Sequence, residues 1–265
     1  MTLGQSVRYA LLDFYFSAIT PCASGGQPAQ IYYMSKDGLD VSISTLVLMI
    51  VTITYKLVLV VIGIGVAVFG RGFVHTYLQG ILPVFYLGLA LNIFCVTFMT
   101  ILVFHPLFAK AIMVKGLKVL ERIHLMKKKE NRLRKLEDSM DTYRDTAAYL
   151  KNNPMVIVKV IGITFVQRMA LFAVTWFVYQ SFGLHGAGFW EILFLQAVIS
   201  VSVDMLPLPG GMGISETLFL TIFKPVFGLL LPGMVLSRGL GYYGELLISA
   251  VFTAVAQLTI GKKES

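Results

Sequence analysis

Charged residues are scarce in this sequence. Only 14% of its 265 residues are Asp, Glu, Lys or Arg, whereas 57% are apolar, and the mean hydropathy is +0.78. A typical soluble domain has roughly 25% charged residues. This composition excludes a soluble globular enzyme, a disordered chain and a nucleic-acid-binding domain.

Cysteine and histidine are also few. Cys22 and Cys95 lie in unrelated contexts, without metal-ligand spacing or a disulfide framework, and the four histidines are scattered. The sequence lacks a Walker loop, a GxSxG motif and a nucleotide-binding fingerprint, which argues against an ATP-driven pump. We therefore expect no catalytic residue, no metal site and no cofactor in this chain.

The net charge of +8 is concentrated in one segment. Residues 105–152 hold 12 of the 22 basic and 6 of the 14 acidic residues, and so carry +6 of it. Cytoplasmic loops of membrane proteins are enriched in Lys and Arg. We therefore expect residues 105–153 to form a basic cytoplasmic arm, and we expect no nucleic acid to bind directly.

The arm is predicted to be an amphipathic helix. Its apolar residues recur at helical spacing: Leu133, Leu136, Met140, Tyr143, Ala147 and Leu150. Such a helix lies on the membrane surface or folds back on the bundle. Two interpretations stay open: the arm only fixes the topology, or it takes part in capturing a lipid.

Long apolar stretches flank the arm on both sides. A helix needs about 20 mostly apolar residues to cross a bilayer. Stretches that meet or approach this length are 42–69, 81–104, 154–182, 189–206 and 237–260. Residues 216–231 are interrupted by Lys224 and Pro225, which predicts a broken or re-entrant segment, and residues 5–19 form a span or half-span.

The predicted fold is therefore an all-α polytopic membrane helix bundle with broken or re-entrant helices. We expect a single membrane domain over residues 1–265, in which residues 1–104 and 154–265 flank the arm. With the arm inside the cell, residues 20–41 also lie inside. The basic tail returns to the inside if both 189–206 and 216–231 cross fully.

Two stretches rich in proline and glycine interrupt the apolar segments. Candidate ligand-binding residues in them are Gly25, Gly26, Gln27 and Gln30 in the first, and Asp204, Pro209, Gly210, Gly211, Gly213 and Glu216 in the second. Glycines let the backbone approach a ligand closely, and amides at a helix N-terminus can bind an anion. The topology predicts that both stretches frame one cytoplasmic opening; the alternative is that both are plain turns.

Charged residues inside the spans are the stronger signal. Lys56, Arg168 and Glu245 fall near the middle of their spans, and Arg238, Tyr242 and Glu245 share one helix face. Ionisable groups at this depth cost about 2.5–3.5 kcal/mol each on insertion scales, so they face a cavity or a partner. Glu245 either pairs with Arg168 or Arg238 to staple the bundle, or these residues line a polar path for a headgroup.

At the two stretches the sequence resembles the lysylphosphatidylglycerol synthase transmembrane family, the membrane half of the multiple peptide resistance factor. The matching motifs are Thr20-Pro21-x3-Gly25-Gly26-Gln27-Pro28-x-Gln30 and Pro207-x-Pro209-Gly210-Gly211-x-Gly213-x-Ser215-Glu216. The segment Tyr143-x6-Leu150-x3-Pro154 is also similar to the family.

The resemblance implies a protein of a bacterial inner membrane that binds and flips an anionic or aminoacylated phospholipid, such as lysylphosphatidylglycerol. This activity contributes to resistance against cationic peptides. By charge, Arg168 and Arg238 would hold the phosphate, and Asp204, Glu216 and Glu245 an aminoacyl ammonium. Family members add a soluble acyltransferase-like domain, which we do not expect here.

Two alternatives stay open. The chain is the membrane subunit of a phosphatidylglycerol lysyltransferase, a transferase whose synthase subunit is a separate chain, or it is a small-solute secondary transporter. The expected partners are phosphatidylglycerol or its lysyl ester, the synthase subunit, and a second copy of the chain.

Overall fold

The computed structural model describes residues 2–105, 108, 110–112, 114–115, 142 and 144–261. Within these residues the secondary structure consists of helices and turns, without a strand. Four helical segments are long and apolar enough to cross a membrane: α3 (Val41–Phe69), α5 (Leu82–Phe104), α8 (Pro154–Ser181) and the continuous segment Leu230–Gln257. The prediction of an all-α polytopic bundle is confirmed.

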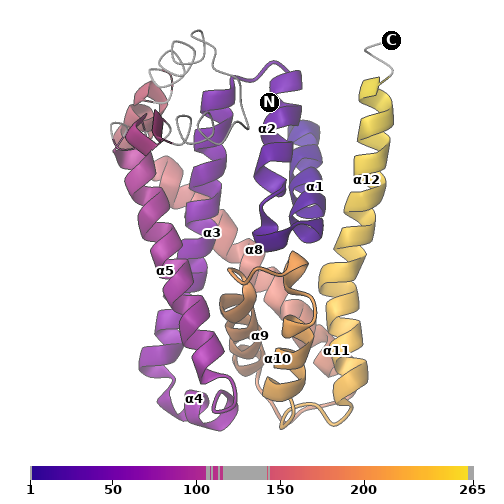
Figure 1. Cartoon of the computed structure of the whole chain (residues 1–265). Helices are drawn as coiled ribbons and strands as arrows, with labels where there is room; N and C mark the ends of the chain where they lie inside the picture. Colours follow the sequence, from indigo (N-terminus) through magenta and orange to yellow (C-terminus); the bar gives the residue numbers. More distant parts are fainter. Residues whose placement is uncertain are drawn as a thin grey trace.

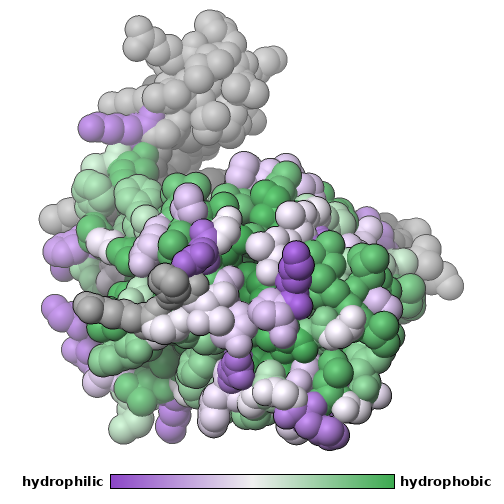
Figure 2. All heavy atoms as spheres, turned by 90° about the horizontal axis from the view of Figure 1, so that it is seen from below, coloured by the Kyte–Doolittle hydropathy of each residue, from purple (hydrophilic) through white to green (hydrophobic). Residues whose placement is uncertain are grey.

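The last of these segments is not a regular α-helix. It consists of α11 (Leu230–Arg238), a π-helical segment η3 (Gly239–Tyr243) and α12 (Gly244–Gly261). The short helix α4 (Arg71–Tyr77) connects α3 to α5 at the end of the molecule opposite both termini (Figure 1). Seen from that end, hydrophilic and apolar side chains are interspersed (Figure 2).

Two helical hairpins reach only halfway through the molecule. The N-terminal hairpin consists of α1 (Leu3–Ile19), η1 (Pro21–Ala23) and α2 (Gly26–Lys36). The second hairpin consists of α9 (Phe189–Val203), η2 (Pro209–Gly211) and α10 (Ile214–Ile222). The hairpins enter from opposite ends, and their tips lie at mid-height (Figure 1).

The second hairpin corrects the predicted crossings. The 15 residues of α9 extend about 22 Å and the nine of α10 about 14 Å, which is less than a hydrocarbon core of about 30 Å. The prediction that 189–206 and 216–231 both cross fully is therefore wrong. The predicted break is correct, because α10 ends at Ile222 and α11 begins only at Leu230.

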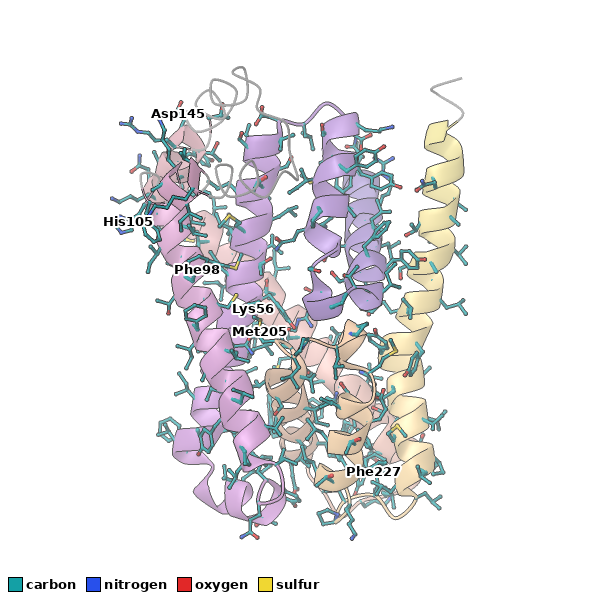
Figure 3. The ribbon with its side chains drawn as sticks, viewed as in Figure 1. Lys56, Phe98, His105, Asp145, Met205 and Phe227 are labelled. Atoms are coloured by element: carbon teal, nitrogen blue, oxygen red, sulfur yellow. The ribbon has the colours of Figure 1, made fainter. Side chains whose placement is uncertain are left out.

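This correction does not change the prediction that the arm and the basic tail lie on the same side of the membrane. Two half-length helices return the chain to the end from which it came, just as two full crossings would. Both termini, His105 and Asp145 lie at the same end of the bundle (Figures 1 and 3). Which face of the membrane this end occupies stays a prediction from the positive-inside rule.

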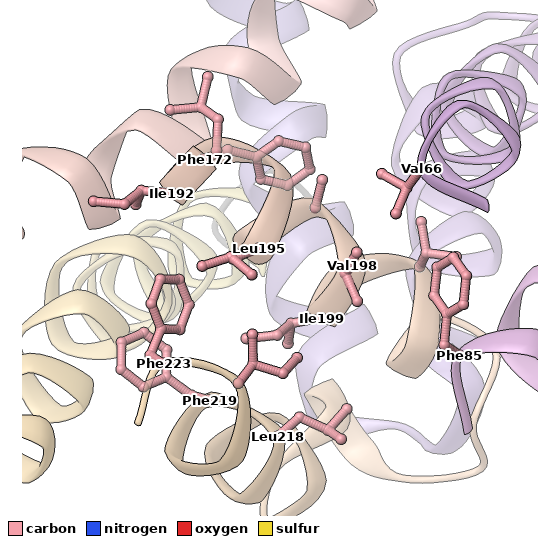
Figure 4. Packing of buried hydrophobic residues seen from close by; sticks show 14 of the residues in the cluster. Val66, Phe85, Phe172, Ile192, Leu195, Val198, Ile199, Leu218, Phe219 and Phe223 are labelled. Atoms are coloured by element: carbon pink, nitrogen blue, oxygen red, sulfur yellow. The ribbon is translucent and has the colours of Figure 1, made fainter. Parts of the chain in front are cut away.

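The main apolar core surrounds the second hairpin. Leu195, Val198 and Ile199 of α9 are almost fully buried and pack against α10 and the adjacent spans (Figure 4). Phe219 and Phe223 stack with their ring centroids 4.3 Å apart. These contacts bury the two short helices in protein. A helix that ends inside the membrane leaves backbone polar groups at its end, and such groups are tolerated there only when protein surrounds them.

The N-terminal hairpin has a small core of its own. Tyr9 and Leu12 of α1 pack with Tyr33 and Met34 of α2 and with Leu48 of α3. A third cluster joins Ala147 and Leu150 to the adjacent ends of α3 and α5. The C-terminal end of the arm therefore folds back on the bundle; the predicted stripe from Leu133 to Tyr143 lies outside the described residues.

Candidate functional site at the junction of two hairpins

The tips of the two hairpins meet in the interior of the bundle. η1 contacts η2, and α1 also contacts η2. The ring of Phe14 near the first tip lies 5.7 Å from the ring of Tyr242 in η3. We call the region formed by η1, η2 and η3 the hairpin junction.

The junction corrects the predicted position of the two motifs. The topology predicted from the sequence puts both motifs at a cytoplasmic opening, whereas Figure 1 shows them together at mid-height. The expectation that they adjoin one another is confirmed by the contact between η1 and η2. Their depth differs because each motif is the tip of a half-length hairpin rather than a loop between full spans.

Glycine determines the backbone of the second tip. Gly210, Gly211 and Gly213 have φ values of 57°, 64° and 83°, in the left-handed region that residues with a side chain rarely adopt. A Cβ atom at position 210 would also overlap the Tyr242 hydroxyl. This tip therefore brings its backbone against η3 more closely than any other residue type would allow.

An ion pair ties the second hairpin to α3. Lys56 Nζ lies 2.5 Å from Asp204 Oδ2 and 2.9 Å from Met205 Sδ. Both charged side chains are 11% exposed, and Tyr55 donates a hydrogen bond to the other oxygen of Asp204. Lys56 and Met205 lie near mid-height in Figure 3. Two of the predicted site residues are therefore partners of one another.

Arg168 on α8 approaches the same group from another side. Its guanidinium carbon lies 4.1 Å from the centre of the Tyr55 ring, a cation–π contact. Its Nε atom is buried and has no hydrogen-bond partner among the described residues. The N–H group at Arg168 Nε is therefore a buried donor without an acceptor within the described structure.

Glu245 does not form the predicted staple. Neither Arg168 nor Arg238 lies within 4 Å of its carboxylate among the ion pairs of the described residues. Glu245 therefore has no ion-pair partner among the described residues.

Glu216 is instead the partner of Arg238. Its Oε1 lies 2.9 Å from Arg238 Nε, and its Oε2 accepts a hydrogen bond of 2.6 Å from the amide of Gly213. The Arg238 guanidinium also lies 4.5 Å from the centre of the Tyr242 ring. The Gly213 amide at this helix start is therefore already engaged by the carboxylate of Glu216, and whether the neighbouring amides bind an anion stays a prediction.

Residues of the first motif mainly hold the N-terminal hairpin together. Gln27 donates to Thr52 of α3, and Gln30 Nε2 donates to the Tyr9 carbonyl at 3.0 Å. The Gly25 amide donates to Thr20 Oγ1 at 2.8 Å. Pro209 begins η2 in the other tip. These contacts position the tips; whether the motif residues also bind a ligand stays a prediction.

The family model for the lysylphosphatidylglycerol synthase TM region matches residues 1–249. This chain belongs to that family. It is therefore a multi-pass membrane protein of the lysylphosphatidylglycerol synthase TM region family, and the match includes every residue of the hairpin junction. Neither curated proteins nor solved structures provide a relative that matches the chain.

Three features of this family member are not predicted from its sequence. Tyr55 and Asp13 contribute polar groups near the junction, and η3 widens the helix so that Tyr242 reaches Gly210. The closely spaced Gly239, Gly241 and Gly244 were an available signal for this irregular turn. Within the described residues there is no group of three His, Cys, Asp or Glu side chains that could hold a metal ion.

Proposed function

We propose that this protein binds an anionic or aminoacylated phospholipid at the hairpin junction and moves its headgroup from one leaflet to the other. The observation that carries the proposal is the depth of the junction. Two ion pairs, Lys56–Asp204 and Arg238–Glu216, join the second hairpin to α3 and to the last span. The tip of this hairpin lies at mid-height (Figure 1). Proteins retain such costly groups in membranes mainly for function.

The geometry supports a path for the lipid headgroup that has polar groups at its centre. A phosphate that leaves water loses hydrogen bonds, and protein donors must replace them. Arg168 offers one such donor, because its Nε has no partner in the described structure while its guanidinium lies on Tyr55. Arg238 Nη2 is also buried without a partner. We assign the phosphate to these two arginines.

An aminoacyl ammonium needs a carboxylate instead. Glu245 suits this role best, since Asp204 and Glu216 are each engaged by a cation of the protein. The lysyl ester of phosphatidylglycerol carries both a phosphate and ammonium groups, and Arg168 and Glu245 would each bind one of these charges. The family match supports a lipid of this kind.

The experiment is lipid translocation in liposomes that contain only the purified chain. A fluorescent phosphatidylglycerol in the inner leaflet becomes accessible to an external quencher when it is flipped. We expect the wild-type chain to accelerate this process and Arg168→Gln to reduce it at least tenfold. Arg8→Gln is the matched control, because Arg8 pairs with Asp37 near the end of the bundle. Equal rates with and without protein would refute the proposal.

The family match also supports a second candidate, the membrane subunit of a phosphatidylglycerol lysyltransferase. The pure chain is then supplied with lysyl-tRNA and phosphatidylglycerol, and we expect no lysylphosphatidylglycerol. Product formation by the chain alone would favour the synthase. Transport of a soluble solute without lipid movement would favour the third candidate, a secondary transporter. We further propose a bacterial inner membrane as the location and cationic-peptide resistance as the consequence.

A further inference from the structure

The tip of the second hairpin, which consists of η2 and the first turn of α10, lies against a buried hydroxyl group. This hydroxyl belongs to Tyr242 of η3, and a Cβ atom at Gly210 would overlap it. The hydroxyl oxygen is buried and has no hydrogen-bond partner among the described residues. A buried polar group without a partner costs free energy, and native proteins contain few of them. The Tyr242 hydroxyl therefore points to a ligand that completes its hydrogen bonding.

Arg238 places a second buried donor beside this hydroxyl. Its Nε lies 2.9 Å from Glu216 Oε1, whereas its Nη2 is buried and has no partner within the described structure. Its guanidinium carbon lies 4.5 Å from the centre of the Tyr242 ring. A hydroxyl can donate or accept a hydrogen bond, but a guanidinium only donates. A ligand that binds both groups must therefore be an acceptor.

Ser215 contributes a second hydroxyl to the same tip. The residue is 2% exposed, and its Oγ would lie 3.0 Å from a Cβ atom at Gly211. In the part of the chain that the structure describes, this hydroxyl forms no hydrogen bond. Ser215 is the second residue of α10, where the helix dipole places positive partial charge. The surroundings of the tip therefore favour an acceptor that is negatively charged.

The nearby carboxylate of Glu216 does not satisfy these donors. It accepts hydrogen bonds from Arg238 Nε at 2.9 Å, from the Gly213 amide at 2.6 Å and from the Tyr243 hydroxyl at 3.3 Å. It holds one edge of the guanidinium and leaves Nη2 to another acceptor. Glu216 is therefore a positioning residue, and the ligand must bring its own oxygen atoms.

We propose that Arg238 Nη2 and the hydroxyls of Tyr242 and Ser215 form an oxyanion site that binds the phosphate of the phospholipid. This inference rests on the proposed function and adds two uncharged residues to headgroup binding. A phosphate has several acceptor oxygens, and hydrogen bonds to an ionised acceptor are the strong ones. The hydroxyls replace hydrogen bonds that the phosphate loses when it leaves water, and Arg238 offsets its charge.

The experiment measures the binding of dihexanoyl phosphatidylglycerol to the full chain by calorimetry in an uncharged detergent. Tyr242→Phe removes only the hydroxyl, and we expect it to weaken binding at least fivefold; Ser215→Ala should weaken it at least threefold. Neither variant should lower Tm, because neither hydroxyl has a partner in the described structure. Dihexanoylglycerol, which lacks the phosphate, should bind the wild type at least tenfold more weakly than the phospholipid.

Tyr33→Phe is the matched control. It also removes one tyrosine hydroxyl, but this hydroxyl lies 2.8 Å from Gln257 Oε1. The control should therefore keep the affinity and lower Tm slightly, which is the opposite of the pattern expected for Tyr242→Phe.

The possible results separate this site from the proposed function. Wild-type affinity in both Tyr242→Phe and Ser215→Ala would overturn the site, because the two hydroxyls would then bind only water. Inorganic phosphate that binds as tightly as the phospholipid would overturn the assignment to a lipid headgroup. A wild-type chain that binds the phospholipid through these hydroxyls but moves none in liposomes would instead refute the proposed function and leave the site intact.

Discussion

Replacing Asp204 with Asn should strongly destabilise the protein, because the substitution leaves Lys56 buried without its carboxylate. Both side chains are 11% exposed in the native pair. Removing one member of a buried ion pair costs about 3–5 kcal/mol, and in a chain of this size 1 kcal/mol corresponds to about 2–4 °C in Tm. We therefore expect Asp204→Asn to lower Tm by about 6–20 °C.

Two further variants make this prediction specific. Lys56→Met/Asp204→Asn removes both charges and should recover most of the lost stability, because no buried ammonium then remains unpaired. Asp37→Asn breaks the pair with Arg8, whose side chains are 31% and 24% exposed. More exposed pairs contribute about 0–1 kcal/mol, so this control should shift Tm by at most about 4 °C.

The assay is thermal unfolding of the purified protein in one detergent, followed by the fluorescence of its native tryptophans. An Asp204→Asn protein whose Tm lies within 2 °C of the wild type would refute the reasoning. So would a double variant that is less stable than Asp204→Asn. Either result would mean that the pair does not join α3 to the second hairpin as the structure describes.

The remaining predictions concern the loop, alkaline pH and topology. Gly210→Ala should lower the free energy of unfolding by about 1–2 kcal/mol or more, because the backbone at position 210 is left-handed and a Cβ atom there would meet Tyr242. Gly65→Ala is the control, because the space around Gly65 is open, and it should leave the stability unchanged. The hydrogen bond to Glu191, with burial, raises the pKa of Tyr77 to about 12. The raised pKa stabilises the folded state below pH 10, and this stabilisation is lost as the pH rises towards 12. The Tm of the wild type should therefore exceed that of Tyr77→Phe by less at high pH than at neutral pH. Finally, a cysteine at Gly72 should react with an impermeant reagent in intact cells, and one at Glu130 only after permeabilisation; the reverse pattern would invert the topology.

The long apolar spans were predictable from the sequence, because length and hydropathy alone require them to cross a bilayer. The half-length hairpins were harder to predict. A stretch such as 189–206 is apolar enough to cross. In the structure its helix packs against α3, α5 and α8 and the chain then turns back, which hydropathy does not reveal. Apolarity does not distinguish a helix that faces lipid from one that faces protein.

The partners of the site residues were less predictable than the residues themselves. The sequence correctly brings the two glycine-rich motifs together, and it singles out Lys56 and Arg238 as buried charges. Their carboxylates, Asp204 and Glu216, lie 148 and 22 residues away along the chain. Such pairing depends on how far each hairpin extends into the bundle, and the spacing of residues along the sequence does not determine this depth. The position of Asp13 against Gly26 likewise depends on the close approach of α1 and α2.

The burial of α9 has a consequence for biogenesis. This helix is too short to remain stably in lipid alone, and it contacts three spans that precede it in the chain, α3, α5 and α8, besides α10 of its own hairpin. Its insertion must await the assembly of α3, α5 and α8, so the second hairpin enters a cradle that the preceding helices have already built.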